Sequence, residues 1–478
     1  MSNKAVSAAW QRITALLDEN SFVEIGGQIT ARSTDFNLSG QDTPSDGVVT
    51  GYGVIDGNPV YVYSQDVSVL NGTIGEMHAK KIVRLYEFAM KTGAPVVGLL
   101  DCAGLRLQES TDALNALGEI YKSQVMASGV IPQITGIFGN CGGGLAVASA
   151  LTDFTFMEDT KGKLFVNTPN AIDGNEISKC DTSCASYQST ETGLVDFRGT
   201  EDEMIAQMRE LICMLPQNFE DDMSYVECTD DLNRALTDIA GCTGDTTIAA
   251  SRIADDQNFV EVKADYAKDM AVGFIRLNGT TTGVIANCCE RYDEEGNVAE
   301  KFDNVISARG AKKAAEFIRF CDAFQIQILT LTNVKGFRAT KCSESAMAKA
   351  VATMTAAFVE ATVPKVNVII SEAYGSAYAV MNSKALGADM VYAWPEAKVG
   401  MMNAAQAAKI MYAEEGADVI REKAAEYEAL QNNVTSAARR GYVDAVIEPE
   451  DTRKYVIGAF EMLFTKRENR PEKKHGTI

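Results

Sequence analysis

Residues 101–106 read DCAGLR and residues 333–338 read NVKGFR, so the acidic or amide residue, the glycine and the arginine recur 232 positions later (333 − 101). The same offset relates three further matches: Ala79-Lys80-Lys81 to Ala311-Lys312-Lys313, Pro132 to Pro364, and Gly143 to Gly375. Solenoid repeats have periods of about 20–50 residues, so this long period indicates two copies of one supersecondary plan. We expect two similar lobes, each with its own binding site.

The length of the chain indicates the number of domains, and its charge limits the kind of partner it can bind. With 478 residues the chain exceeds the ~250–300 at which one core stops growing, so we expect two domains, at residues 1–245 and 246–478. The formal charge of −21 disfavours a nucleic-acid partner, because such binding depends on clustered Lys and Arg that neutralise phosphates. A small ligand with phosphates is still compatible with an acidic chain that has a local basic pocket.

The cysteines, the histidines and the apolar stretches exclude several further classes. The eleven cysteines form no CxxC pair, which is typical of reduced thiols in a cytoplasmic protein rather than of a zinc site. No stretch is continuously apolar over the length of a signal peptide or a membrane span. His78 and His475 are the only histidines, so we expect no metal centre. Ser-His or Cys-His catalysis would have to use His78, which we expect to be a packed or capping residue.

The hydrophobic pattern predicts an α/β fold with βαβ units. Residues 47–55 and 59–66 alternate like strands on either side of a DGNP turn, which predicts a hairpin. Helical periodicity over 76–91, closed by Gly93, is followed by the buried-strand sequence PVVGLLD. The further expected features are helices at 113–129, 201–214, 311–324 and 345–361, a second hairpin at 271–287, a polar insertion at 290–301, a C-terminal third that is helical to about 437, and a mostly solvated basic tail from 466.

The glycine cluster GNCGGG at 139–144 follows a predicted strand and precedes an apolar segment. It lacks the lysine and hydroxyl of a phosphate loop and the glycine spacing of a dinucleotide site. Bare N–H groups at a helix start can approach a carbonyl oxygen closely and stabilise the negative charge that develops there. A tight strand-to-helix turn is the alternative interpretation. The matching turn of the second lobe, at 373–377, is also rich in small residues, which favours two sets of amide donors.

Several charged residues near these turns have two interpretations each. Arg106 and Arg338 each lie two residues after a glycine at the end of a predicted strand, where α/β sheets bind ligands, but for either one alone we favour a surface or salt-bridging role over ligand contact. The pair Lys80-Lys81, like its second-lobe counterpart, is expected on a solvated helix surface, with phosphate contact as the alternative. Asp101 and Glu109 are a candidate general acid and base, although eight residues across a turn separate them.

These stretches together resemble the carboxyltransferase subunits of biotin-dependent acyl-CoA carboxylases and of related acyl-CoA decarboxylases. The resemblance extends from about residue 12 to the end of the chain. It implies an α/β fold of two tandem crotonase-like lobes of βαβ type, with a CoA thioester held by the first lobe and carboxybiotin by the second. The segments that carry it are specific in combination and include GEMHAKKIV at 75–83, SGVIPQITGIFGNCGGG at 128–144, EAYGSAYAVM at 372–381 and LGADMVYAWPEA at 386–397.

The resemblance also implies residue roles and a mechanism. The backbone N–H groups of Gly143 and Gly144 match the family's oxyanion hole for the thioester enolate, and those of Ser376 and Ala377 match the hole for the biotin ureido oxygen. Carboxybiotin then releases CO2, the ureido anion takes the α-proton of the acyl-CoA, and the enolate attacks CO2, without a catalytic histidine. The residues expected to bind the two ligands are Gly104, Arg106, Gly142, Lys80, Gly336, Phe337, Gly375 and Ala379.

The family implies partners as well. These are a separate biotin carboxyl carrier protein with a biotin carboxylase, or a membrane decarboxylase subunit, and a homodimeric unit that commonly assembles into a hexamer. A sodium-pump-associated decarboxylase and a non-catalytic scaffold subunit are the alternatives to a carboxylase component. The resemblance leaves open which acyl group is used and in which direction the transfer runs.

Three departures from the family pattern bear on these expectations. The usual PGF loop reads KGFRAT at 335–340, which affects the geometry expected at the biotin site. Ala379 is smaller than the Asp or Ile common at that position, which enlarges the pocket and points to an acyl group larger than acetyl. The turn at 101–106 is bulkier than usual and also resembles malonate decarboxylase subunits.

Overall fold

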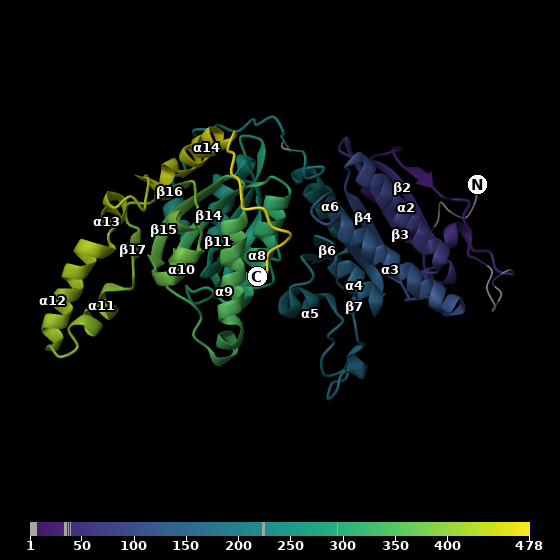
Figure 1. The fold of residues 1–478 in the computed structure, drawn as a ribbon, viewed down its shortest axis with the longest axis horizontal. Helices are drawn as coiled ribbons and strands as arrows, with labels where there is room; N and C mark the ends of the chain where they lie inside the picture. The colour runs from purple at the N-terminus through teal and green to yellow at the C-terminus, as the bar shows by residue number, and fades with distance from the viewer. Residues whose placement is uncertain (1–6, 33–35, 37, 39, 222–224, 294) are drawn as a thin grey trace. The chain divides into compact units, whose positions relative to one another are not determined.

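The computed structural model describes residues 7–32, 36, 38, 40–221, 225–293 and 295–478. The chain folds into two compact units, residues 1–224 and 225–478, called the first and second unit from here on (Figure 1). Residues 225–245, which the sequence expectation assigned to the first domain, fold with the second unit. Tyr225 forms a β-bridge with Thr280, and the Leu236 N–H donates to the carbonyl of Glu450 at 2.9 Å.

The first unit is built around one sheet with the strand order β1-β2-β3-β4-β5-β6-β8, in which β7 also pairs with β5. The expected hairpin is confirmed, since β2 and β3 pair antiparallel, whereas β3 to β8 pair in parallel. The strands are β1 Val23–Ile25, β2 Val48–Ile55, β3 Asn58–Gln65, β4 Val96–Cys102, β5 Gln133–Gly142, β6 Phe154–Glu158, β7 Lys163–Phe165 and β8 Phe197–Gly199. The helices are α1 Ala8–Leu16, α2 Glu76–Thr92, α3 Ser110–Ala127, α4 Gly144–Ala150, α5 Ala185–Tyr187 and α6 Glu201–Met214.

The helix boundaries follow from local chemistry. Helix α2 buries its apolar residues at helical spacing and ends at Gly93, whose φ of 66° is a left-handed C-cap that glycine adopts without strain. Helix α6 begins with a capping box in which Thr200 and Glu203 satisfy each other's backbone N–H groups. Both predicted helices, 76–91 and 201–214, are therefore confirmed.

The second unit repeats this plan with the strand order β18-β16-β15-β14-β11-β10-β9, in which β17 also pairs with β15. The strands are β9 Val260–Val262, β10 Met270–Leu277, β11 Thr280–Asn287, β14 Gln327–Val334, β15 Lys365–Tyr374, β16 Met390–Ala393, β17 Lys398–Gly400 and β18 Ala445–Val446, and the separate hairpin β12 Glu290–Tyr292 and β13 Val298–Lys301 forms the polar insertion. The helices are α7 Thr246–Ile253, α8 Ala308–Ala323, α9 Lys341–Glu360, α10 Gly375–Val380, α11 Ala404–Met411, α12 Ala417–Tyr427, α13 Val434–Arg439 and α14 Thr452–Leu463. Helices α8 and α9 lie side by side, while α11 and α12 project away from the sheet (Figure 1).

The internal repeat extends to individual hydrogen bonds. In the first unit the Ile74 N–H donates to Gly104 O at 3.0 Å, and the Arg106 N–H donates to Ile74 O at 2.9 Å. In the second unit Ile306, Gly336 and Arg338 form the same two bonds, each at 3.0 Å. The 232-residue offset therefore marks equivalent backbone positions.

Two expectations about the chain's periphery need correction. Lys81 and Lys313 are buried rather than solvated, because each ammonium donates to two backbone carbonyls, and burial lowers the pKa of Lys313 to about 7. The C-terminal third is not simply helical, since β16, β17 and β18 join the sheet. The tail from 466 is mostly solvated, as expected, although Lys466 and Arg470 are partly buried and Arg470 donates to the last carbonyls of α9. No helix in the described ranges has the length and apolar character needed to cross a bilayer.

Candidate active site

In the first unit, strand β5 runs into helix α4 through residues 142–145, which we call the first amide turn. Gly143 is the N-cap of α4 with φ 61° and ψ −126°, a conformation that side chains rarely adopt. Its N–H donates to Phe165 O at 2.8 Å, so this amide is engaged by strand β7. The N–H groups of Gly144 and Leu145 follow at the helix start, where backbone donors have no intrahelical acceptor. Of the Gly143 and Gly144 pair that the resemblance indicated, the Gly143 N–H is therefore engaged within the chain.

The glycines of this turn serve two different purposes. A Cβ on Gly144 would lie 2.7 Å from Leu117 Cδ2 and 2.8 Å from the Tyr121 hydroxyl, so helix α3 backs the turn closely. The Tyr121 hydroxyl also donates to Gly144 O at 2.5 Å, which fixes the peptide. A Cβ on Gly143 would meet nothing within 4 Å, so that side of the turn is open.

In the second unit, strand β15 runs into helix α10 through residues 374–377, which we call the second amide turn. Gly375 has φ 62°, close to the value of Gly143, and a Cβ there would lie 3.1 Å from Met401 O. Ser376 is exposed and Ala377 is buried, and their N–H groups lie in the first turn of α10.

The two amide turns are in the same register. Strand β7 pairs with β5 up to Gly142, and β17 pairs with β15 up to Tyr374, its counterpart 232 residues later (374 − 142). The same offset places Ser376 and Ala377 opposite Gly144 and Leu145. The donor pair inferred from the structure of the first turn thus matches the pair expected for the second.

Arg106 lies beneath the turn formed by residues 101–109 rather than on its surface. The side chain is 1% exposed, and its Nη1 lies 2.6 Å from Asp46 Oδ1 and 2.7 Å from Glu109 Oε1. Its Nη2 donates to Thr73 O at 2.8 Å. Its role in this structure is to hold the turn that carries Gly104, whose φ of 109° suits glycine.

His78 is fully buried against the same cluster. Its backbone N–H donates to Asp46 Oδ2 at 2.7 Å, its Nδ1 lies 3.0 Å from Asp46 O, and its Nε2 lies 3.3 Å from Gln65 Nε2. Burial, together with the Arg106 charge, lowers the pKa of His78 to about 3, so the ring is neutral. The expectation of a packed histidine is confirmed.

Asp101, Glu109 and Lys80 each form an ion pair with a residue outside the amide turns. Asp101 lies 3.4 Å from Arg12 Nη1 and Glu109 lies 2.7 Å from Arg106 Nη1, so each carboxylate is paired with a different arginine. Lys80 is 51% exposed and forms an ion pair with Glu76 on the same helix at 2.6 Å.

The loop after β14 carries the remaining predicted residues. Gly336 and Phe337 are half-buried, and Phe337 forms a β-bridge with Ile306. Ala379 follows the second amide turn in α10 and is half-buried, and its carbonyl accepts from the Ser383 hydroxyl at 2.8 Å.

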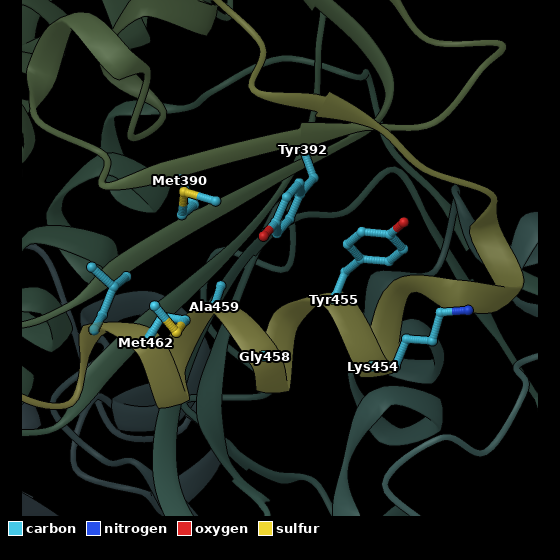
Figure 2. A pocket seen from close by; sticks show the side chains of 8 residues that line it. Met390, Tyr392, Lys454, Tyr455, Gly458, Ala459 and Met462 are labelled. Atoms are coloured by element: carbon cyan, nitrogen blue, oxygen red, sulfur yellow. The ribbon is translucent and has the colours of Figure 1, made fainter.

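A groove of about 340 Å³ in the second unit lies away from these residues. It is formed by strand β16 and helix α14 (Figure 2). Met390 and Tyr392 extend from the strand, and Tyr455 and Met462 extend from the helix. Neither amide turn contributes to its lining.

The whole chain matches a known family. The carboxyl transferase domain family matches residues 3–478. The chain belongs to this family. It is 39% identical to methylmalonyl-CoA decarboxylase subunit alpha of Propionigenium modestum, over 98% of this chain and 92% of that protein. It is 40% identical to the propionyl-CoA carboxylase beta chain of Roseobacter denitrificans, over 98% of this chain and 93% of that protein.

A solved structure of the family has the same fold. The transcarboxylase 12S structure with hydrolysed methylmalonyl-coenzyme A bound, described as a hexamer assembly, matches with a TM-score of 0.91 and 35% identity. The match covers 99% of this chain and 93% of that one. The expected fold class, an α/β protein with two tandem lobes, is thereby confirmed.

Proposed function

We propose that this chain is a carboxyltransferase component that moves a carboxyl group between biotin on a separate carrier protein and the α-carbon of a short-chain acyl-CoA. Membership of the family supports the reaction class. The observation that carries the residue assignment is the pair of register-matched amide turns, one in each unit. A reaction between two carbonyl-type ligands uses one such turn for each.

In the first unit, the N–H groups of Gly144 and Leu145 hold the thioester carbonyl oxygen. When the α-carbon loses a proton or a carboxyl group, the negative charge moves onto this oxygen as an enolate. Amides already aimed at that position stabilise the enolate more than the neutral thioester, and removing one such donor typically costs about 3–4 kcal/mol. Gly143 and Gly104, beside which a Cβ would meet nothing within 4 Å, keep side chains away from the ligand, and Gly142 packs against the Phe165 ring at the base of the turn.

In the second unit, the N–H groups of Ser376 and Ala377 suit the oxygen of a cyclic urea. Two main-chain donors without an intrahelical acceptor fit an oxygen that gains negative charge when the ring nitrogen is deprotonated. Gly375 brings the backbone close without a side chain, and Gly336 and Phe337 flank the site. When bound, biotin supplies or accepts the carboxyl group.

The same assignment accounts for the absence of a role for His78. Its ring is neutral and buried, so the contribution of this chain to catalysis is positioned amides. We assign Lys80 to the CoA phosphates as an exposed cation, and Ala379 to a pocket with room for an acyl group larger than acetyl. Arg106 acts indirectly, by holding the 101–109 turn.

The proposal includes partners. The expected partners are a biotin carboxyl carrier protein and a biotin carboxylase, or a membrane decarboxylase subunit, and a homodimer or hexamer is the expected assembly. Support comes from the relatives, which include a carboxylase beta chain, a decarboxylase alpha subunit and a hexameric transcarboxylase core. The eleven free cysteines support a cytoplasmic location.

The test is transfer of the carboxyl group from methylmalonyl-CoA to free biotin by the purified chain, followed by chromatography of the CoA thioesters. The proposal predicts conversion to propionyl-CoA that depends on biotin. No loss of methylmalonyl-CoA or malonyl-CoA under any condition would reject both transfer directions. A non-catalytic scaffold, suggested by the altered loop at 335–340, would also bind neither acyl-CoA nor biotin in calorimetry.

A further inference from the structure

Arg338 differs from its first-unit counterpart Arg106 in the partners of its side chain. Arg106 is neutralised by Asp46 and Glu109. At the position of Glu109 the second unit has the basic residue Lys341 (341 − 109 = 232). Asp269, which precedes β10 much as Asp46 precedes β2, accepts instead from the backbone N–H and the hydroxyl of Ser307, both at 3.0 Å. The second unit has therefore kept the arginine and lost both of its carboxylate partners.

The guanidinium of Arg338 has no counter-charge within the described part of the chain. It forms no ion pair there, and its buried Nε has no hydrogen-bond acceptor. The residue as a whole is half-buried, so it is reachable but only partly hydrated. A partly desolvated guanidinium without a partner is unfavourable by itself, and an anionic ligand would relieve this cost.

The backbone of Arg338 lies at the sheet edge that carries the second amide turn. Strand β14 ends at Val334, whose register partner on β15 is Ala373, two residues before Gly375. The Arg338 N–H donates to Ile306 O at 3.0 Å, which holds the loop at this edge. Ligands of parallel sheets bind at the carboxyl ends of the strands, where both segments lie.

The two neighbouring lysines do not share the environment of Arg338. Lys335 follows Val334 directly, and its ammonium lies 3.2 Å from Glu372 Oε2. Lys341 opens helix α9 and is exposed to water. Arg338 is therefore the cation of this loop that is partly buried and has no ion-pair partner in the described part of the chain.

We propose that Arg338 binds a carboxylate, namely the one carried on the ureido ring of carboxylated biotin, beside the second amide turn. This assignment rests on the proposed function. The planar guanidinium matches a carboxylate through two parallel hydrogen bonds, which a lysine cannot form. With the amides of Ser376 and Ala377 on the urea oxygen, Arg338 gives the second unit a means of distinguishing carboxylated from free biotin.

Calorimetry on the full chain tests the assignment with two probes. One is free biotin, and the other is a stable biotin derivative with a carboxymethyl group on the ureido nitrogen. Arg338→Met should weaken binding of the acidic derivative about 10- to 100-fold, the range of a charged hydrogen-bonded contact, and leave biotin within about twofold. Arg338→Lys should recover only part of the loss. The matched control is Lys349→Met, which removes an exposed charge from helix α9.

Transfer kinetics give a second readout. The substitution cannot change the equilibrium constant of the reaction, so the loss of a contact that is also made in the transition state must lower kcat/KM in both directions. From methylmalonyl-CoA to free biotin, Arg338→Met should lower kcat about 10- to 100-fold at an unchanged KM for biotin. Circular dichroism and the melting temperature establish that the variant is folded.

The outcomes separate this assignment from the proposed function. If the unmodified chain transfers no carboxyl group, the proposed function fails and the assignment fails with it. If the unmodified chain is active and Arg338→Met binds the acidic derivative normally, the assignment alone fails. Equal weakening of biotin and its derivative would indicate a structural role, and weakened acyl-CoA binding would indicate a phosphate contact. Either result overturns the proposal.

Discussion

Ser376→Pro removes one main-chain donor from the second amide turn and places the ring Cδ where the amide hydrogen was. Proline lacks the N–H and is tolerated in the first turn of a helix, where that N–H has no intrahelical acceptor. The side chain of Ser376 is exposed, and the preceding residue is Gly375, whose missing Cβ reduces the usual restriction before proline. The substitution therefore tests the amide itself.

The expected magnitude comes from the chemistry of an oxyanion site. Losing one donor costs about 3–4 kcal/mol of transition-state stabilisation, which corresponds to a fall in kcat of about 10²–10³. The assay is carboxyl transfer from methylmalonyl-CoA to free biotin at saturating acyl-CoA. Since acyl-CoA is assigned to the first unit, its dissociation constant should not change.

The matched control is Ser376→Ala, which removes the hydroxyl and keeps the N–H. It should retain kcat within about threefold of the unmodified chain, because the hydroxyl is assigned no part in the reaction. If the proline variant is folded by circular dichroism and its kcat equals that of the alanine variant, the amide of Ser376 does not stabilise a developing charge.

Three further substitutions test the packing, the titration and the acyl pocket. Gly144→Ala places a Cβ 2.7 Å from Leu117 Cδ2 and 2.8 Å from the Tyr121 hydroxyl, so urea denaturation should show about 1–3 kcal/mol of destabilisation, and an unchanged midpoint would contradict the close packing. Burial lowers the pKa of His78 from 6.5 to about 3, so the unfolded chain binds this proton first as the pH falls. Relative to His78→Gln, the unmodified chain should lose up to about 1.4 kcal/mol of unfolding free energy per pH unit between these two values, and parallel stability curves would refute the shift. Ala379→Ile should lower kcat/KM for methylmalonyl-CoA relative to malonyl-CoA by about tenfold, and an equal effect on both would remove Ala379 from the acyl pocket.

Local patterns were sufficient for much of the fold. The hairpin at 47–66 followed from alternation on both sides of a DGNP turn, and the helices at 76–91 and 201–214 followed from periodicity and end signals. The duplicated plan followed from the 232-residue offset. Short strands were missed: β18 has two residues, and it joins the sheet only through β16, more than fifty residues earlier.

The site was predictable in outline but not in atomic detail. Glycine content located the first amide turn, but which N–H is open depends on the bond from Gly143 to Phe165 on another strand. Lys81 looks like a solvated helix residue because its acceptors, the carbonyls of Ser45 and Val48, lie more than thirty residues earlier. Such contacts come from tertiary packing and leave no signal in the local sequence.

The assignment of the donors to the main chain has an evolutionary consequence. Every amino acid except proline carries a backbone N–H, so random point substitutions at Gly144, Leu145, Ser376 or Ala377 seldom delete the stabilising group itself. Such substitutions change the side chains that surround this N–H group. Drift in such a protein would then change which molecules are accepted long before it abolished turnover, and would leave a template from which new acceptor preferences arise.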